Sequence, residues 1–225
     1  MSDAGHDLWV FAYGSLMWRP GFRYAEARHG RLTGYRRCFC IYSIHHRGTK
    51  ARPGLVLGLD RGGACEGIAY RVPAADAVAT VRYLRAREQV NGVYHEAHVP
   101  VQLMGEPRLE VLALAYIVER AHPSYAGQLP PIHEARLIRG ASGKSGNNLD
   151  YLISTLRHLG ELGIRERGLE RVLTLIGPHT ARCGAAGHAS PYVAGLLHVA
   201  RRQPTPRRDM RIGDPRRFLY RQQLR

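Results

Sequence analysis

The sequence has 225 residues, enough for one sizeable domain with its own core, and its 44% apolar and 23% charged residues are typical of a globular protein. The longest nearly apolar run, Val111 to Val118, is too short to span a bilayer, and the first seven residues lack the basic and apolar regions of a secretory signal. The formal net charge of +15 allows an acidic partner such as nucleic acid, although nearly all of the positive charge is arginine.

The first half of the chain is rich in expected strands. Leu8 to Tyr13 is a β-rich apolar run that ends at Gly14, which predicts a buried strand followed by a turn. Further runs of the same kind, each bounded by turn residues, cover 32–42, 55–59, 67–72, 94–103 and 109–118. Residues 60–63, Asp-Arg-Gly-Gly, separate two of these runs and predict a hairpin.

A helix is expected between the strands, from Pro73 to Glu88, because proline fits the first turn and Asn91-Gly92 can end the helix. We expect its apolar stripe to contain Val78, Tyr83 and Leu84.

The second half of the chain favours helices. They are expected at 132–139, 149–159 and 169–176, with a short additional helix at 192–199. Asn147 or Asn148 can cap the second of these, and residues 140–146 are predicted to form a flexible connector. Strands first and helices later indicate an α+β domain.

The turn Tyr13-Gly14-Ser15-Leu16 is a place where backbone N–H groups can converge. Glycine permits a positive φ or a close approach, and convergent N–H groups suit a carboxylate or a developing oxyanion. Taken alone, however, a Gly-Ser pair after a strand is usually only a turn.

Glu88 is the second candidate for chemistry. A carboxylate near the C-terminus of a helix opposes the helix dipole, so it must be solvated, paired or needed for a reaction. An ion pair with Arg87 or Arg85 on the surface is the simpler explanation from the local sequence.

Several blocks together resemble one family. Residues 10–18, Val-Phe-Ala-Tyr-Gly-Ser-Leu-Met-Trp, are similar to the opening strand of the ChaC-type, glutathione-specific γ-glutamyl cyclotransferases, with Ala12 in place of a glycine. The other similar blocks follow in family order at 35–40, 46–54, 67–73, 87–94, 122–125 and 140–152. The resemblance covers residues 9 to about 176 and is far more specific than any single block.

The resemblance implies the γ-glutamyl-cyclotransferase-like fold, a small mixed β-barrel with flanking helices, and an enzyme without a cofactor. In the implied reaction, the α-amine of the γ-glutamyl group of glutathione attacks its own δ-carbonyl, giving 5-oxoproline and cysteinylglycine. Another γ-glutamyl compound could take the place of glutathione. Glu88 is the implied general acid and base.

The resemblance also implies a substrate site. Its expected members are Val10, Phe11, Ala12, Tyr13, Gly14, Ser15 and Leu16, with Tyr125 and Tyr151 as hydrogen-bonding walls and Arg37 as a partner for a substrate carboxylate. A structural ion pair is an equally good interpretation of Arg37.

The four cysteines have no recurring spacing, which argues against a disulfide framework and favours the reducing cytoplasm. Cys38 and Cys40 lie near His45 and His46, but no second cysteine pair stands at the spacing of metal ligands, so we expect no metal.

The end of the chain differs in composition. Residues 201–225 contain nine arginines against Asp209 and Asp214. We expect residues 1–182 to form the cyclotransferase domain and residues 183–225 to be a basic, Arg/Pro-rich extension that is solvated or disordered. The alternative function is a basic module that binds nucleic acid or an acidic partner, which the family resemblance disfavours.

Deleting residues 184–225 separates the two functions. A cyclotransferase should retain its activity, because the similar blocks end near residue 176, whereas a protein that binds through its tail should lose its salt-dependent affinity for nucleic acid. Release of 5-oxoproline and a salt titration of binding measure the two outcomes. Loss of activity together with the tail would contradict the assignment of residues 1–182.

Overall fold

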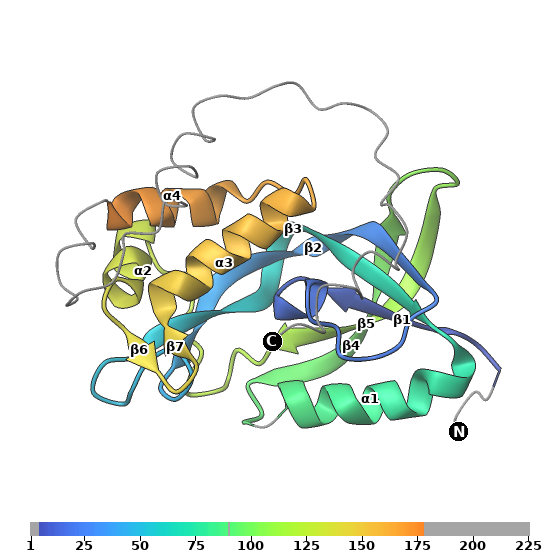
Figure 1. Ribbon diagram of the computed structural model, residues 1–225, viewed down its shortest axis with the longest axis horizontal. Coiled ribbons are helices and arrows are strands. Elements are labelled where there is room, and N and C mark those ends of the chain that lie inside the picture. Colours follow the sequence, from blue (N-terminus) through green and yellow to red (C-terminus); the bar gives the residue numbers. More distant parts are fainter. Residues whose placement is uncertain (1–4, 90, 178–225) are drawn as a thin grey trace, which may run out of the picture. The chain divides into compact units, whose positions relative to one another are not determined.

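A closed barrel lies at the centre of the computed structural model, which describes residues 5–89 and 91–177 (Figure 1). Its strands are β1 (Leu8–Ala12), β2 (Glu26–Ser43), β3 (Gly54–Val72), β4 (Tyr94–Leu103) and β5 (Leu109–Val118). They follow the order β1-β3-β2-β4-β5, and all neighbours are antiparallel except β1 and β5, which pair in parallel and close the barrel. This mixed barrel with flanking helices confirms the expected fold class.

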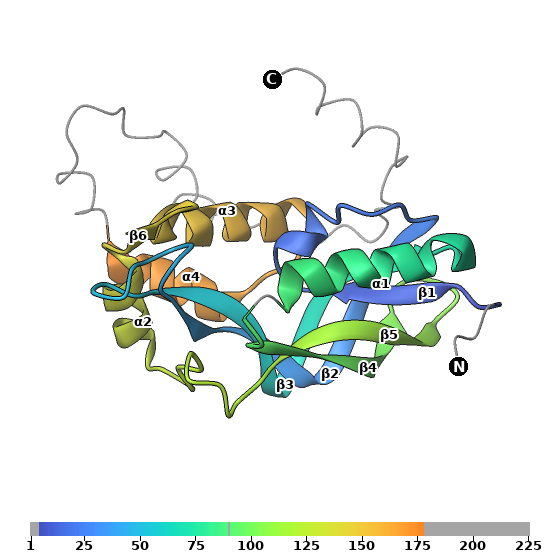
Figure 2. The ribbon, with the colours of Figure 1, turned by 90° about the horizontal axis from the view of Figure 1, so that it is seen from below.

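The helices divide into two groups around the barrel (Figures 1 and 2). Helix α1 (Ala74–Glu88) lies on one side, while α2 (Pro131–Ile138), α3 (Asn148–Glu161) and α4 (Arg167–Ile176) gather on another. The short 3-10 helix η1 (Ser15–Met17) follows β1. In the part of the chain that the structure describes, no helix is long and apolar enough to cross a membrane.

Both faces of β1 are buried, which explains why its sequence is apolar throughout rather than alternating. Phe11 belongs to a cluster made by residues of all five barrel strands. Its neighbours Val10 and Ala12 pack on the opposite face, in a cluster that includes Leu84 of α1 and Leu152 of α3.

The hairpin predicted at residues 60–63 is wrong, because β3 runs without a break from Gly54 to Val72. Gly62 and Gly63 have φ values of 99° and 74°, and they lie where the pairing with β2 shifts register. The glycines thus form a bulge in one long strand rather than a turn between two strands. Strand β2 also begins earlier than expected, because residues 26–31 pair with residues 66–71 of β3.

The connector predicted to be flexible is ordered instead. It contains the paired strands β6 (Ser142–Gly143) and β7 (Gly146–Asn147), and the N–H groups of Lys144 and Ser145 donate to the carbonyl oxygens of His45 and His46. A Cβ atom at Gly143 would lie 2.5 Å from the His45 carbonyl oxygen, so a glycine is required where the two segments touch.

Two adjacent asparagines start α3 in different ways. The Oδ1 atom of Asn147 accepts a hydrogen bond from the N–H of Leu149, which confirms the predicted cap. Asn148 has no exposed surface, and its side-chain amide exchanges two hydrogen bonds of 2.7 Å with the N–H and C=O of Leu55 in β3. Asn148 therefore fixes the start of α3 to the sheet. The predicted helix at 192–199 and the basic extension lie outside the described residues.

Replacing Asn148 by alanine should lower the free energy of unfolding by about 2 to 4 kcal/mol, because two buried backbone groups of Leu55 lose their partner. Asn147→Ala, its neighbour, should cost only about 1 kcal/mol, the usual value of a cap. Urea unfolding of both variants measures the difference. Equal losses would contradict the two-point link between α3 and β3.

Candidate active site

Helix α1 brings Glu88 to the barrel. The buried side chains of this helix are Thr80 and Leu84, and Glu88 follows Leu84 by four residues, so it continues the same face. The predicted stripe is correct for Leu84 but wrong for Val78 and Tyr83, which are 64% and 36% exposed. Since Val78 lies six residues before Leu84, about 240° around the helix, the two cannot face the barrel together.

Glu88 lines a cavity of about 420 Å³, counting its open side. The walls come from β1 and the turn after it, β3, α1, β4, β5 and α3: Phe11, Tyr13, Gly14, Ser15, Leu16, Leu57, Glu88, Tyr94, Tyr116 and Tyr151. The cavity therefore unites the two candidate motifs of the sequence, the Gly-Ser turn and the glutamate. Of the expected site residues, Val10 and Ala12 are fully buried and do not line it.

The turn at Gly14 differs in detail from the expectation. Gly14 has a φ of −128°, so it does not use the left-handed region, and a Cβ atom there would meet no heavy atom within 4 Å. The glycine thus leaves space open beside the cavity. Ser15 and Leu16 begin η1, and the first N–H groups of a helix have no acceptor within it. These N–H groups are suited to an anionic ligand.

Arg37 lies behind the turn and not in the cavity. Its side chain has no exposed surface, and its guanidinium donates to the carbonyl oxygens of Tyr13 and Glu66 and to the Glu166 carboxylate at 2.7 Å. These contacts use each of its nitrogens. Of the two interpretations of Arg37, the structure therefore gives the structural ion pair rather than a side chain that faces a ligand.

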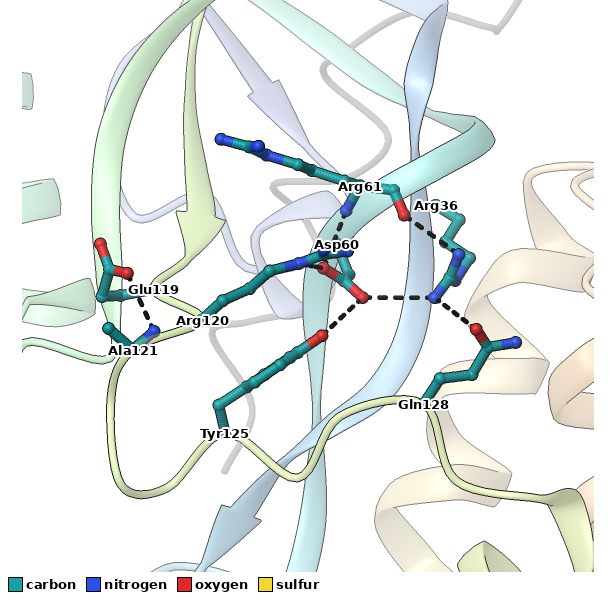
Figure 3. Close-up of polar contacts among 8 residues, drawn as sticks. All are labelled: Arg36, Asp60, Arg61, Glu119, Arg120, Ala121, Tyr125 and Gln128. Atoms are coloured by element: carbon teal, nitrogen blue, oxygen red, sulfur yellow. Dashed lines mark hydrogen bonds and ion pairs between the residues drawn. The ribbon is translucent and has the colours of Figure 1, made fainter.

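Tyr125 does not line the cavity either. Its hydroxyl instead donates to Asp60 at 3.1 Å (Figure 3). Asp60 is 1% exposed and also contacts Arg36 at 3.2 Å and Arg120 at 2.7 Å. Burial raises the pKa of Asp60, but the hydrogen bonds from Arg120, the Arg61 N–H and Tyr125 outweigh it and hold that pKa below its usual value. Tyr125 thus ties the segment after β5 to the barrel.

The Glu88 carboxylate is desolvated and paired at the same time. Its side chain is 19% exposed, and burial raises its pKa above the usual value, while Arg87, with Nε 3.0 Å from Oε1, partly offsets the rise. The ion pair expected from the sequence is therefore present, but it lies at the cavity rather than on open surface.

Four tyrosines surround Glu88, and only Tyr13 and Tyr151 were expected in the site. Burial raises the pKa of each, to about 12 for Tyr151, so all four are neutral near pH 7. The hydroxyl of Tyr94 donates to the Leu57 carbonyl oxygen at 2.7 Å. Tyr94 belongs to the block at 87–94 and could have been found there, whereas Tyr116 and Leu57 had no signal beyond apolar strands.

The other polar groups near the cavity form smaller contacts. The Arg47 guanidinium lies 5.1 Å from the centre of the Tyr151 ring, and Tyr116 donates to Glu96 at 3.2 Å. Within residues 5–89 and 91–177, no group of three or more His, Cys, Asp or Glu side chains is arranged to hold a metal ion.

Known proteins resemble the chain over this whole region. The family model described as ChaC-like protein matches residues 8–179. The glutathione-specific gamma-glutamylcyclotransferase of Escherichia coli (strain K12) is 35% identical over 169 residues, which cover 75% of this chain and 72% of that protein. The glutathione-specific gamma-glutamylcyclotransferase 1 of Mus musculus is 35% identical over 174 residues, covering 76% and 78% of the two chains.

The fold has a solved counterpart as well. The crystal structure of a γ-glutamyl cyclotransferase specific to glutathione from yeast matches with a TM-score of 0.69 at 22% identity, covering 77% of this chain and 99% of that one. This likeness concerns the fold.

Replacing Arg37 by leucine should lower the free energy of unfolding by about 3 to 5 kcal/mol, because it leaves Glu166 and two carbonyl oxygens without their donor. Arg31→Leu, on the same strand, should cost less than about 1 kcal/mol, because Arg31 and Glu66 form an exposed pair at 3.6 Å. Urea unfolding compares the two variants. A loss of less than about 1 kcal/mol for Arg37→Leu would contradict a stabilising role for the buried contacts of Arg37.

Proposed function

Since the chain belongs to the ChaC-like protein family, we propose that it is a γ-glutamyl cyclotransferase that converts glutathione to 5-oxoproline and cysteinylglycine. The relatives in Escherichia coli and Mus musculus are named for this specificity. The observation that carries the proposal is the meeting of the partly buried Glu88 with the Gly14-Ser15-Leu16 turn in one cavity.

The reaction suits a cavity of this kind because both reacting groups belong to one substrate. The α-amine nitrogen forms a bond to the δ-carbonyl carbon, and the bond from that carbon to the cysteine nitrogen breaks. Neither a protein nucleophile nor an electron acceptor enters this balance. Holding the γ-glutamyl chain folded for ring closure supplies much of the rate.

The turn after β1 is the proposed binding site of the γ-glutamyl group. The N–H groups at Gly14, Ser15 and Leu16 and the Ser15 hydroxyl suit the substrate carboxylate and the oxyanion that develops on the δ-carbonyl. Phe11 and Tyr13 complete this wall. Val10 and Ala12 have no exposed surface and do not line this wall; they hold the turn in place only as members of β1.

Glu88 is the proposed acid and base. It accepts a proton from the attacking amine and returns it to the leaving amine, so one carboxylate serves both halves of the reaction. Burial raises the pKa of Glu88, which favours this role because a carboxylate of higher pKa is a stronger base toward the attacking amine.

We also propose that the catalytic domain ends near residue 182, which the family match over residues 8–179 supports. A cytoplasmic location is supported by the free thiols of Cys38, Cys40 and Cys65, because thiols persist in reducing compartments.

Glu88→Gln should fold as the natural chain does and lose at least about a hundredfold in 5-oxoproline release from glutathione, the usual share of general acid–base catalysis. Glu134→Gln is a matched control: burial raises the pKa of Glu134 to about 7, but it lies in α2 and does not line the cavity. The control should retain its activity. Retained turnover in Glu88→Gln would contradict its role.

The same assay with γ-glutamyl dipeptides tests the substrate. Faster release from a dipeptide than from glutathione would move the specificity to other γ-glutamyl compounds. The absence of 5-oxoproline with all of them would overturn the proposed function.

A further inference from the structure

The side chain of Arg87 in α1 reaches two residues that line the cavity from different parts of the chain. Its Nε atom lies 3.0 Å from Glu88 Oε1, and its Nη2 donates to Ser15 Oγ at 2.9 Å. Its Nη1 donates to the Arg19 carbonyl oxygen at 2.7 Å and to the Tyr83 hydroxyl at 3.0 Å. Each nitrogen of the guanidinium is therefore engaged.

We propose that Arg87 is a positioning residue, which holds the Glu88 carboxylate and the Ser15 hydroxyl in a fixed relation for ring closure. The inference rests on the proposed function. Ser15 and Arg87 are 72 positions apart in the sequence, so this contact joins the helix that carries the base to the turn that binds the substrate. A guanidinium suits the task because its N–H groups diverge in a rigid plane, which a lysine ammonium cannot reproduce.

The contact also sets the role of Ser15. A serine oxygen that accepts a hydrogen bond from a guanidinium retains its own O–H proton for donation. Because Ser15 lines the cavity, that proton is available to a carboxylate or a developing oxyanion of the substrate. Arg87 thus prepares an anionic base on one side and a hydrogen-bond donor on the other.

The charge of Arg87 acts on Glu88 among groups that are otherwise neutral. The titratable groups that interact with Glu88 come from the turn after β1, β4, β5, α3 and α1: Tyr13, Tyr94, Tyr116, Tyr151 and Arg87. The tyrosines are protonated across the neutral range, since burial raises their pKa values. Burial also raises the pKa of Glu88, and Arg87 opposes that rise, so losing Arg87 must move the titration of Glu88 to higher pH.

The test compares full-length Arg87→Gln and Arg87→Lys with Ser15→Ala. The matched control is Arg82→Gln, which removes an exposed arginine of the same helix. The rate of 5-oxoproline release from glutathione is measured from pH 5 to 9 to give kcat, KM and the acid limb of kcat/KM. The Glu88 carboxyl carbon is titrated in parallel by NMR.

In Arg87→Gln we expect the acid limb and the NMR titration of Glu88 to move up by about one pH unit, with kcat reduced at least tenfold. Arg87→Lys keeps the positive charge but loses the diverging N–H groups of the guanidinium. Its acid limb should therefore stay near that of the natural chain while kcat/KM falls. Ser15→Ala should lower kcat/KM without moving the limb, and adding it to Arg87→Gln should cost less than the product of the two single losses.

An unmoved acid limb and NMR titration in Arg87→Gln, with kcat/KM within twofold, would overturn the inference and leave Arg87 a surface ion pair. If Arg87→Gln does not fold, Arg87→Lys decides: unchanged kcat/KM in that variant would likewise overturn it. A natural chain that releases no 5-oxoproline would overturn the proposed function instead, and the NMR titration would still report whether Arg87 controls Glu88.

Discussion

Strand β1 is enclosed on every side, and the site depends on that enclosure. Along its edges it pairs with β3 antiparallel and with β5 in parallel, and its two faces contact the barrel interior and the helices. A strand held in this way cannot slide, because a shift of one residue would exchange its two buried faces. The place where the turn at Gly14 leaves the barrel is therefore fixed. The Arg37 guanidinium also fixes the start of this turn, because its Nε donates a hydrogen bond to the Tyr13 carbonyl oxygen.

Three buried or partly buried charged residues, Asp60, Arg37 and Glu88, differ in how completely they are paired, and the difference distinguishes structural residues from the candidate catalytic one. Asp60 and Arg37 have partners on all sides, so each is a closed network with no position left for a ligand. Glu88 contacts Arg87 and otherwise faces neutral tyrosines and the open cavity. An incompletely paired, desolvated carboxylate is costly to a fold and useful to a reaction, and that contrast distinguishes the site from the scaffold.

The sequence was sufficient where a feature depends on neighbours along the chain. The cap at Asn147, the buried run of β1 and the block around Glu88 are of this kind. It was insufficient where distant pairing decides. Gly62 and Gly63 suit a hairpin or a bulge equally, and only the register with β2 selects the bulge. The sequence could not decide whether Arg37 contacts substrate or a structural partner, because nothing near Arg37 indicates that it pairs with Glu166, 129 positions away.

The cavity has walls from six separate regions that span residues 11 to 151. Each region contributes one to five residues, and none of them encloses a space by itself. A fragment that lacks any one of these regions therefore lacks part of the cavity wall. The parallel pairing of β1 with β5, which closes the barrel, holds two of these regions beside each other. Activity therefore depends on the complete barrel. Molecules in which the barrel is open lack the assembled cavity, so the active fraction measures the fraction of molecules in which the barrel has closed.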